Sequence, residues 1–130
     1  MSGNRALLDT CAAIAVLEAD SAAVRELQTV DTLTICLTVL GELYFGAMKS
    51  RRVIENTARV ESFVGACELL VGDRQTAQLY GAIKAELQQK GRPIPENDVW
   101  IAAFARQHDM TLYTKDIHFR GIDGVSIASW

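Results

Sequence analysis

Cysteine and histidine are scarce in this sequence, and their scarcity excludes several kinds of site. The three cysteines, Cys11, Cys36 and Cys67, are odd in number and widely spaced, which argues against a disulfide framework or a zinc knuckle and predicts buried thiols. The two histidines, His108 and His118, have no partner at metal-ligand spacing, so we expect surface or structural roles for them. Histidine catalysis is therefore not expected.

Long apolar runs, low-complexity tracts and internal repeats are also missing. No stretch approaches the ~18 uninterrupted apolar residues of a membrane span. The N-terminal apolar run is cut by Asp9 and has no small-residue cleavage pattern. With 49% hydrophobic and 22% charged residues, the composition is ordinary for a globular protein. We expect one cytoplasmic domain, residues 1–130, that does not associate with membranes.

Strand-like and helix-like segments alternate along the chain. Short apolar or β-branched runs predict strands at 6–8, 32–38, 68–71, 110–113 and 125–128. Longer patterns with helical spacing predict helices at 10–19, 20–29, 39–47, 53–63, 74–90 and 99–107. Such alternation with short loops predicts an α/β fold, a three-layer α/β/α sandwich with a mostly parallel sheet of about five strands.

Side chains near the predicted helix starts suggest how each helix begins. Asp9 or Thr10 is a candidate N-cap for the first helix, and Thr38 is a candidate for the helix from Val39. Gly46 lies inside that helix at a cost of ~1 kcal/mol, which suggests close packing. The connector 91–98 holds both prolines, and Asn97 or Asp98 is expected to be the cap or first residue of the next helix.

Four acidic residues lie where predicted strands end or helices begin. Asp9 follows the first strand and Asp116 follows the fourth. Glu42 lies in the first or second turn of one helix, and Asp98 lies at the start of another. Each alone has an ordinary explanation as a cap or as a complement to the helix dipole. However, the carboxyl ends of parallel strands meet at one edge of a sheet, where ligands bind. We therefore expect the four carboxylates to converge.

Converging carboxylates need a counter-charge. Two unit charges ~5 Å apart repel by ~3 kcal/mol at an effective dielectric near 20, and no buried lysine or histidine is expected nearby. Mg²⁺ or Mn²⁺ would supply the charge, and such a site suits phosphodiester hydrolysis. The net charge of −3 includes these acids, and several basic residues could rim the site for nucleic-acid phosphates: Lys49, Arg51, Arg52, Lys90, Arg92, Lys115 and Arg120.

Four short motifs resemble those of the PIN-domain endoribonucleases, specifically the VapC-like toxins of type II toxin–antitoxin systems. The motifs are Leu7-Leu8-Asp9-Thr10, Gly41-Glu42-Leu43 with Gly46, Asn97-Asp98 followed by Ile101-Ala102-Ala103, and Thr114-Lys115-Asp116 with Phe119. Each motif is weak, but the ordered set spans essentially the whole chain. Two positions depart from the family pattern: Cys11 stands where Asn is frequent, and Lys115 precedes Asp116 where many relatives carry Asn beside the acid.

The resemblance implies a function and a set of site residues. Asp9, Glu42, Asp98 and Asp116 would be the catalytic, metal-binding acids, supported by the side chains of Thr114 and Asn97. The activity would be Mg²⁺- or Mn²⁺-dependent endonucleolytic cleavage of RNA. The family also implies a homodimer and inhibition by a cognate antitoxin protein.

Two other functions are compatible with parts of the pattern. A phosphorelay receiver also gathers acids around Mg²⁺ at strand ends, but it usually has an acidic pair near the first strand, where Asp9 stands alone. An inactive PIN-like module would bind protein or nucleic acid only, and the presence of all four acids argues against it. Trp100, Tyr44 and Phe119 could stack on bases, although core packing is the stronger interpretation.

Overall fold

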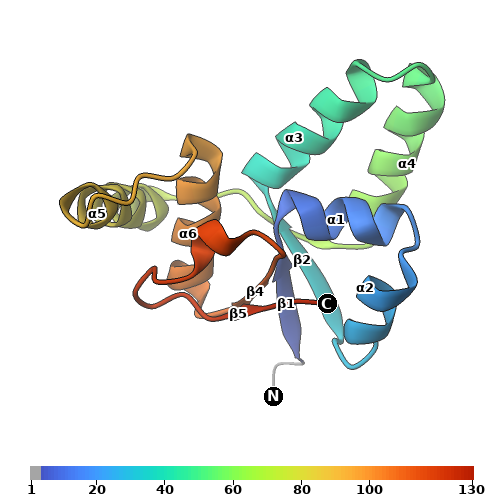
Figure 1. The fold of residues 1–130 in the computed structure, drawn as a ribbon. Coiled ribbons are helices and arrows are strands. Elements are labelled where there is room, and N and C mark those ends of the chain that lie inside the picture. Colours follow the sequence, from blue (N-terminus) through green and yellow to red (C-terminus); the bar gives the residue numbers. More distant parts are fainter. Residues whose placement is uncertain (1–3) are drawn as a thin grey trace.

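The computed structural model describes residues 4–130 and contains five strands, six α-helices and one short 3₁₀ helix (Figure 1). In chain order they are β1 (Arg5–Leu8), α1 (Thr10–Leu17), α2 (Ser21–Glu26), β2 (Thr32–Cys36), α3 (Leu37–Met48), α4 (Val53–Gly65), β3 (Glu68–Leu70), α5 (Arg74–Gln89), α6 (Glu96–His108), β4 (Thr111–Tyr113), η1 (Ile117–Phe119) and β5 (Ile127–Ala128). All the predicted strands and helices are present, with bounds that differ by a few residues.

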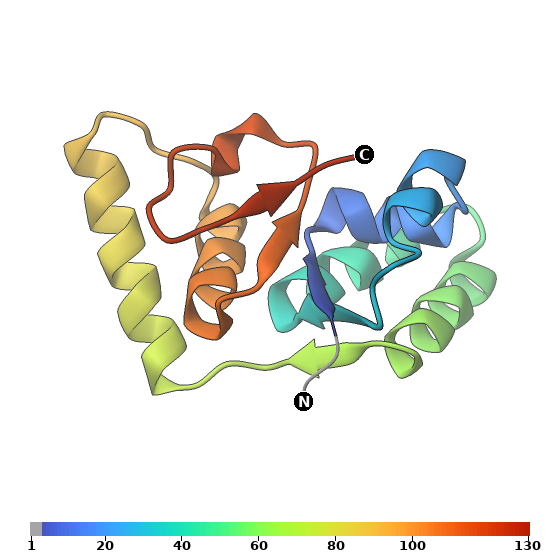
Figure 2. The same cartoon turned by 90° about the horizontal axis from the view of Figure 1, so that it is seen from below.

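The five strands form one parallel sheet in the order β3-β2-β1-β4-β5. β1 is central, and its Leu7 is paired with Thr34 on β2 and with Leu112 on β4. Helices α1 to α4 lie on one side of the sheet and α5 and α6 lie on the other, as Figures 1 and 2 show from two directions. The predicted three-layer sandwich is confirmed. The strand order differs from the 2-1-3-4-5 order of receiver domains, so the receiver hypothesis is discarded.

The core is built around β1 and α6. Three of the four residues of β1, Ala6 to Leu8, are completely buried, and the α6 segment 101–105 is at most 3% exposed. A strand buried on both faces and a helix buried nearly all round are the rigid centre of an α/β protein. The predicted core role of Phe119 is confirmed at 1% exposure. Trp100 stacks on Tyr80 of α5 with ring centroids 4.0 Å apart.

The starts of α3 and α6 differ from the predictions. α3 begins at Leu37 after Cys36, so Thr38 lies inside the helix and is not its cap. α6 begins at Glu96 because Pro95, with φ −54° and ψ 146°, sets an extended residue just before the helix. Asn97 and Asp98 are consequently second and third in the first turn, and the prediction that one of them is the cap or first residue was wrong.

Helix α3 carries an open apolar face. A Cβ atom added at Gly46 would meet nothing within 4 Å, so the close packing predicted there was wrong. Large apolar side chains are exposed on α3 and at the start of α4: Leu37, Phe45, Met48 and Ile54.

Among the described residues, no helix combines the length and apolar character needed to cross a membrane.

Candidate active site

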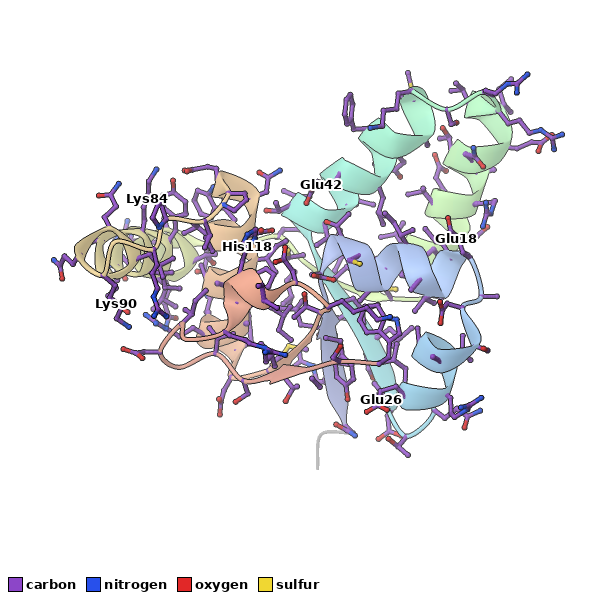
Figure 3. The ribbon with its side chains drawn as sticks, viewed as in Figure 1. Glu18, Glu26, Glu42, Lys84, Lys90 and His118 are labelled. Carbon is purple, nitrogen blue, oxygen red and sulfur yellow. The ribbon has the colours of Figure 1, made fainter. Side chains whose placement is uncertain are left out.

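Four acidic residues lie at the carboxyl edge of the central strands. Asp9 directly follows β1, and Asp116 follows β4 by three residues. Glu42 lies in the second turn of α3, which continues from β2, and Asp98 lies in the first turn of α6. Figure 3 shows Glu42 on α3 and His118 on η1 at this same edge. The topology therefore brings these acids to one end of the sheet, as the strand pattern predicted.

Asp9 is both a helix cap and a buried member of this acidic group. Its Oδ1 accepts a hydrogen bond from the backbone N–H of Ala12 at 2.7 Å, which caps α1. Its Oδ2 accepts one from Thr114 Oγ1 at 2.5 Å, and the residue is 4% exposed. Each carboxylate oxygen keeps a second lone pair for a cation. The N-cap explanation and the site explanation are thus compatible.

Thr114 joins two of the acids through one hydroxyl group. Its Oγ1 donates to Asp9 Oδ2 and accepts the backbone N–H of Asp116 at 2.8 Å. The side chain is 2% exposed, so water does not compete with these bonds. Thr114 thereby fixes the distance between the ends of β1 and β4.

Glu42 is held by the residue after Asp9. The hydroxyl of Thr10 donates to Glu42 Oε1 at 2.6 Å, which connects the first turn of α1 to the second turn of α3. Because Thr10 is adjacent to Asp9, this bond ties the Glu42 carboxylate to the central strand. Glu42 is half-buried.

His118 lies among the acids, which the sequence did not indicate. Its Nδ1 is 3.0 Å from Asp116 Oδ1 and 3.6 Å from Asp98 Oδ2. Asp98, Asp116 and His118 each offer one ligand atom, and these atoms lie within 4.8 Å of one another. The expectation concerned a buried lysine or histidine, whereas His118 is exposed. A 3₁₀ turn brings His118, two residues after Asp116, close to the Asp116 carboxylate.

Burial, together with repulsion between the acids, raises the pKa values of Asp9 and Asp98. Burial, then the charges of Asp116 and Glu42, raise the pKa of Asp98 to about 6, although His118 opposes the shift. Burial also raises the pKa of Asp9 against the hydrogen bonds from Thr114 and Ala12, and the same two charges add to this rise. Since Asp116 and Glu42 act on both neighbours, the carboxylates form one electrostatic group that a cation would stabilise.

An open groove of about 970 Å³ runs beside Glu42 between α3 and the α5–α6 pair. Its walls carry Asn97 together with apolar side chains that include Phe45 and Trp100. Asn97 is exposed and next to Asp98, so it lies beside the acids without a described hydrogen bond to them. Of the four acids, Glu42 lines this groove.

The predicted basic residues are only partly gathered around the acids. Lys49, Arg51 and Arg52 are exposed at the turn between α3 and α4, the end farthest from the sheet in Figure 1. Lys90 pairs with Asp123 at 3.4 Å, and Lys115 lies on the loop directly before Asp116. Lys115 and Arg120 line one hollow together with Thr114 and Asp116, so these two basic residues lie beside an acid of the site.

The cysteines only partly match their predicted burial. Cys36 is buried and Cys67 is half-buried, but Cys11 is exposed on the first turn of α1. The prediction of a buried thiol was thus wrong for Cys11, because its side chain lies on the solvent side of α1 while Ala12 and Ala13 face the core. The negative charges of Asp9 and Asp116, after burial, help to raise the pKa of its thiol.

Comparisons with known proteins identify close likenesses over nearly the whole chain. A family model described as PIN domain matches residues 6–125, a span that includes Asp9, Glu42, Asp98 and Asp116. The tRNA(fMet)-specific endonuclease VapC of Salmonella typhimurium is 34% identical over 127 residues, which cover 95% of this chain and 96% of that protein. Ribonuclease VapC2 of Rickettsia felis is 32% identical over 101 residues, or 77% of this chain and 75% of that protein.

Solved structures give the same result. The DNA-bound VapBC complex of Salmonella typhimurium contains a chain with a TM-score of 0.86 and 30% identity, covering 98% of both chains. A chain of VapBC2 from Rickettsia felis, bound to a DNA fragment from its promoter, has a TM-score of 0.86 and 28% identity, covering 97% of this chain and 98% of that one.

Proposed function

The chain belongs to the PIN domain family, and from this premise we propose that it is a divalent-metal-dependent endoribonuclease and the toxin of a toxin–antitoxin pair. The observation that carries the proposal is the convergence of the four acids at the carboxyl edge of β1, β2 and β4. The curated relatives are named as a ribonuclease and as a tRNA-specific endonuclease, which supports RNA as the substrate class.

The donor set fits Mg²⁺ or Mn²⁺. Carboxylate oxygens are the ligands these hard cations take in proteins, and the raised pKa values of Asp9 and Asp98 indicate an uncompensated negative site. Asp9, Asp98 and Asp116 would hold the cation directly or through water, and Glu42 would complete the cluster or orient the attacking water. The chemistry supplied by a bound cation is activation of water and stabilisation of the leaving oxygen.

The remaining residues position these acids and the substrate. The hydroxyl of Thr114 hydrogen-bonds both Asp9 and Asp116, and the hydroxyl of Thr10 hydrogen-bonds the Glu42 carboxylate. Asn97, on the wall of the groove beside Glu42, is placed to hydrogen-bond the RNA backbone. Sequence-specific recognition of RNA mostly targets single-stranded loops and ends, and the open groove beside Glu42 would accept such a strand.

Two protein partners follow from the same proposal. The structural neighbours are chains of VapBC complexes, which supports a cognate antitoxin for this chain. The exposed apolar side chains of α3, Leu37, Phe45 and Met48, supply surface for a homodimer or for the antitoxin. The extent of the domain, residues 1–130, and the cytoplasmic location stay predictions.

A direct test is cleavage of an RNA pool by the purified protein with Mg²⁺, with Mn²⁺ and with a chelator. We expect endonucleolytic products with either metal, loss of products with the chelator and recovery when metal is added back. Mixing in the cognate antitoxin should suppress cleavage. If RNA binds but remains intact with every metal, the inactive binding module becomes the better explanation.

A further inference from the structure

The histidine two residues after Asp116 extends the site beyond its carboxylates. We propose that His118 is a nitrogen ligand of the divalent cation, so that this site mixes oxygen and nitrogen donors and prefers Mn²⁺ to Mg²⁺. This inference rests on the proposed function and deepens it, because it assigns a residue and a metal preference to the same site.

The first observation is the position of the imidazole. Its Nδ1 lies 3.0 Å from one oxygen of Asp116 and 3.6 Å from one oxygen of Asp98. Each of these three residues offers one ligand atom, and the three atoms lie within 4.8 Å of one another. This separation is compatible with ligands of one ion. Asp9 and Glu42 are outside this trio, so the imidazole is the third potential ligand beside the two carboxylates.

The second observation is that the backbone builds this position. Asp116 caps η1, because its Oδ1 accepts the backbone N–H of His118 at 2.9 Å. The next residue, Phe119, is fully packed in the core. A capped turn on one side and a buried anchor on the other hold the Cα of His118 beside the acids, so its proximity does not depend on a free loop.

The third observation is access. The His118 side chain is 48% exposed, while that of Asp98 is 19% exposed. The imidazole therefore forms the solvent side of the trio and Asp98 forms the inner side. A cation arriving from solvent would pass the imidazole before it reached the buried carboxylate.

The chemistry of the donor atoms decides which metal benefits. Mn²⁺ also takes oxygen ligands and is the weakest binder of the first-row divalent metals, but as a transition metal it accepts an imidazole nitrogen more readily than Mg²⁺, which keeps carboxylate and water oxygens in a strict octahedron. An acid-only site distinguishes Mg²⁺ from Mn²⁺ weakly. Adding one nitrogen ligand should bind Mn²⁺ more tightly without an equal gain for Mg²⁺. The competing interpretation is that His118 only hydrogen-bonds the acids and leaves the metal to oxygen ligands.

Pulsed electron paramagnetic resonance of Mn²⁺ bound to the full chain distinguishes the two interpretations. Directly bound imidazole gives ¹⁴N modulation of the Mn²⁺ signal. We expect this modulation in the wild-type protein and in the control His108→Gln, which alters the other histidine. It should be lost in His118→Gln. Wild-type protein that binds Mn²⁺ without nitrogen modulation, or modulation that persists in His118→Gln, would overturn the proposal.

Calorimetric titration with Mn²⁺ and Mg²⁺ supplies the second readout. Loss of one ligand should weaken Mn²⁺ binding by about 10-fold or more, on the scale of other losses at metal sites, and should change Mg²⁺ binding much less. His118→Asp, which restores an oxygen donor, should recover metal binding with the ratio shifted toward Mg²⁺. Equal effects on both metals would refute the preference.

Two outcomes separate this inference from the proposed function. Wild-type protein that binds neither metal would overturn both this inference and the metal dependence of the proposed nuclease. A nuclease that is active with Mg²⁺ but shows no nitrogen modulation would overturn this inference alone.

Discussion

Replacing Asp98 with Asn is expected to lower RNA cleavage by about 10²-fold or more, the scale on which single electrostatic groups act in active sites, and to stabilise the metal-free protein at neutral pH. The activity falls because a ligand carboxylate is lost beside Asp116 and His118. The stability rises because Asn has nearly the same shape as Asp and carries no charge into a site whose burial opposes ionisation.

The direction of the stability change depends on pH. The pKa of Asp98 is near the ordinary 3.8 in the unfolded chain and about 6 in the folded protein. Between these values the folded protein keeps a proton that the unfolded chain has released, so the free energy of unfolding falls as pH rises through this window. Above pH 6 the ionised carboxylate is a constant penalty of about 2–3 kcal/mol, at 1.36 kcal/mol per pKa unit.

Urea denaturation of wild type and Asp98→Asn, in the presence of a chelator, measures this effect. The two stabilities should be close near pH 4 and should separate by pH 7, with the variant more stable. Excess Mn²⁺ should stabilise the wild type and leave the variant nearly unchanged. Asp109→Asn is the matched control, because Asp109 is exposed at the C-cap of α6, where a left-handed φ of 49° also suits Asn. If Asp98→Asn were less stable than wild type at pH 7, the ionised Asp98 carboxylate would not be destabilising the metal-free protein.

Replacing Thr114 with Val should cost about 2–4 kcal/mol of stability, because it leaves two buried polar groups, Asp9 Oδ2 and the Asp116 N–H, without their partner. Valine has nearly the volume of threonine, so packing changes little. The pKa of Asp9 should rise further once the Thr114 hydrogen bond that lowers it is removed, and metal binding should then need a higher pH.

The control for this prediction is Thr114→Ser, which keeps the hydroxyl and removes only a methyl group. Urea denaturation at pH 7 should give a smaller loss for Ser than for Val, and metal affinity should follow the same order. If Ser and Val lost equal stability, the methyl group and not the hydroxyl would be the important part of Thr114.

The sequence predicted the sheet and the acids because both depend on strong local signals. The apolar run before Asp9 and the seven apolar residues after Asp98 required burial on both sides, and parallel strands then determined which edge the acids share. The start of α6 was misplaced because the extended backbone at Pro95 makes that residue the N-cap. The prediction had instead used the polar side chains of Asn97 and Asp98 to locate the cap.

His118 was missed for a different reason. A three-residue 3₁₀ turn has no hydrophobic period, so the spacing between Asp116 and His118 carries no pattern that a sequence reader can recognise. The open surface at Gly46 was missed because a glycine inside a helix marks close packing and free surface equally well. Both errors concern positions whose role depends on neighbours that are distant in the sequence.

The central place of β1 in the sheet has a consequence for the timing of activity during protein synthesis. β1 pairs with β4, so that Leu8 meets Tyr113 and Asp9 meets Thr114. A ribosome that has made only the first hundred residues has already produced Asp9, Glu42 and Asp98, but it has not produced the strand that aligns them. Since domains fold as units during translation, the nascent chain should remain harmless to the RNA around it until the segment from Thr111 has left the exit tunnel.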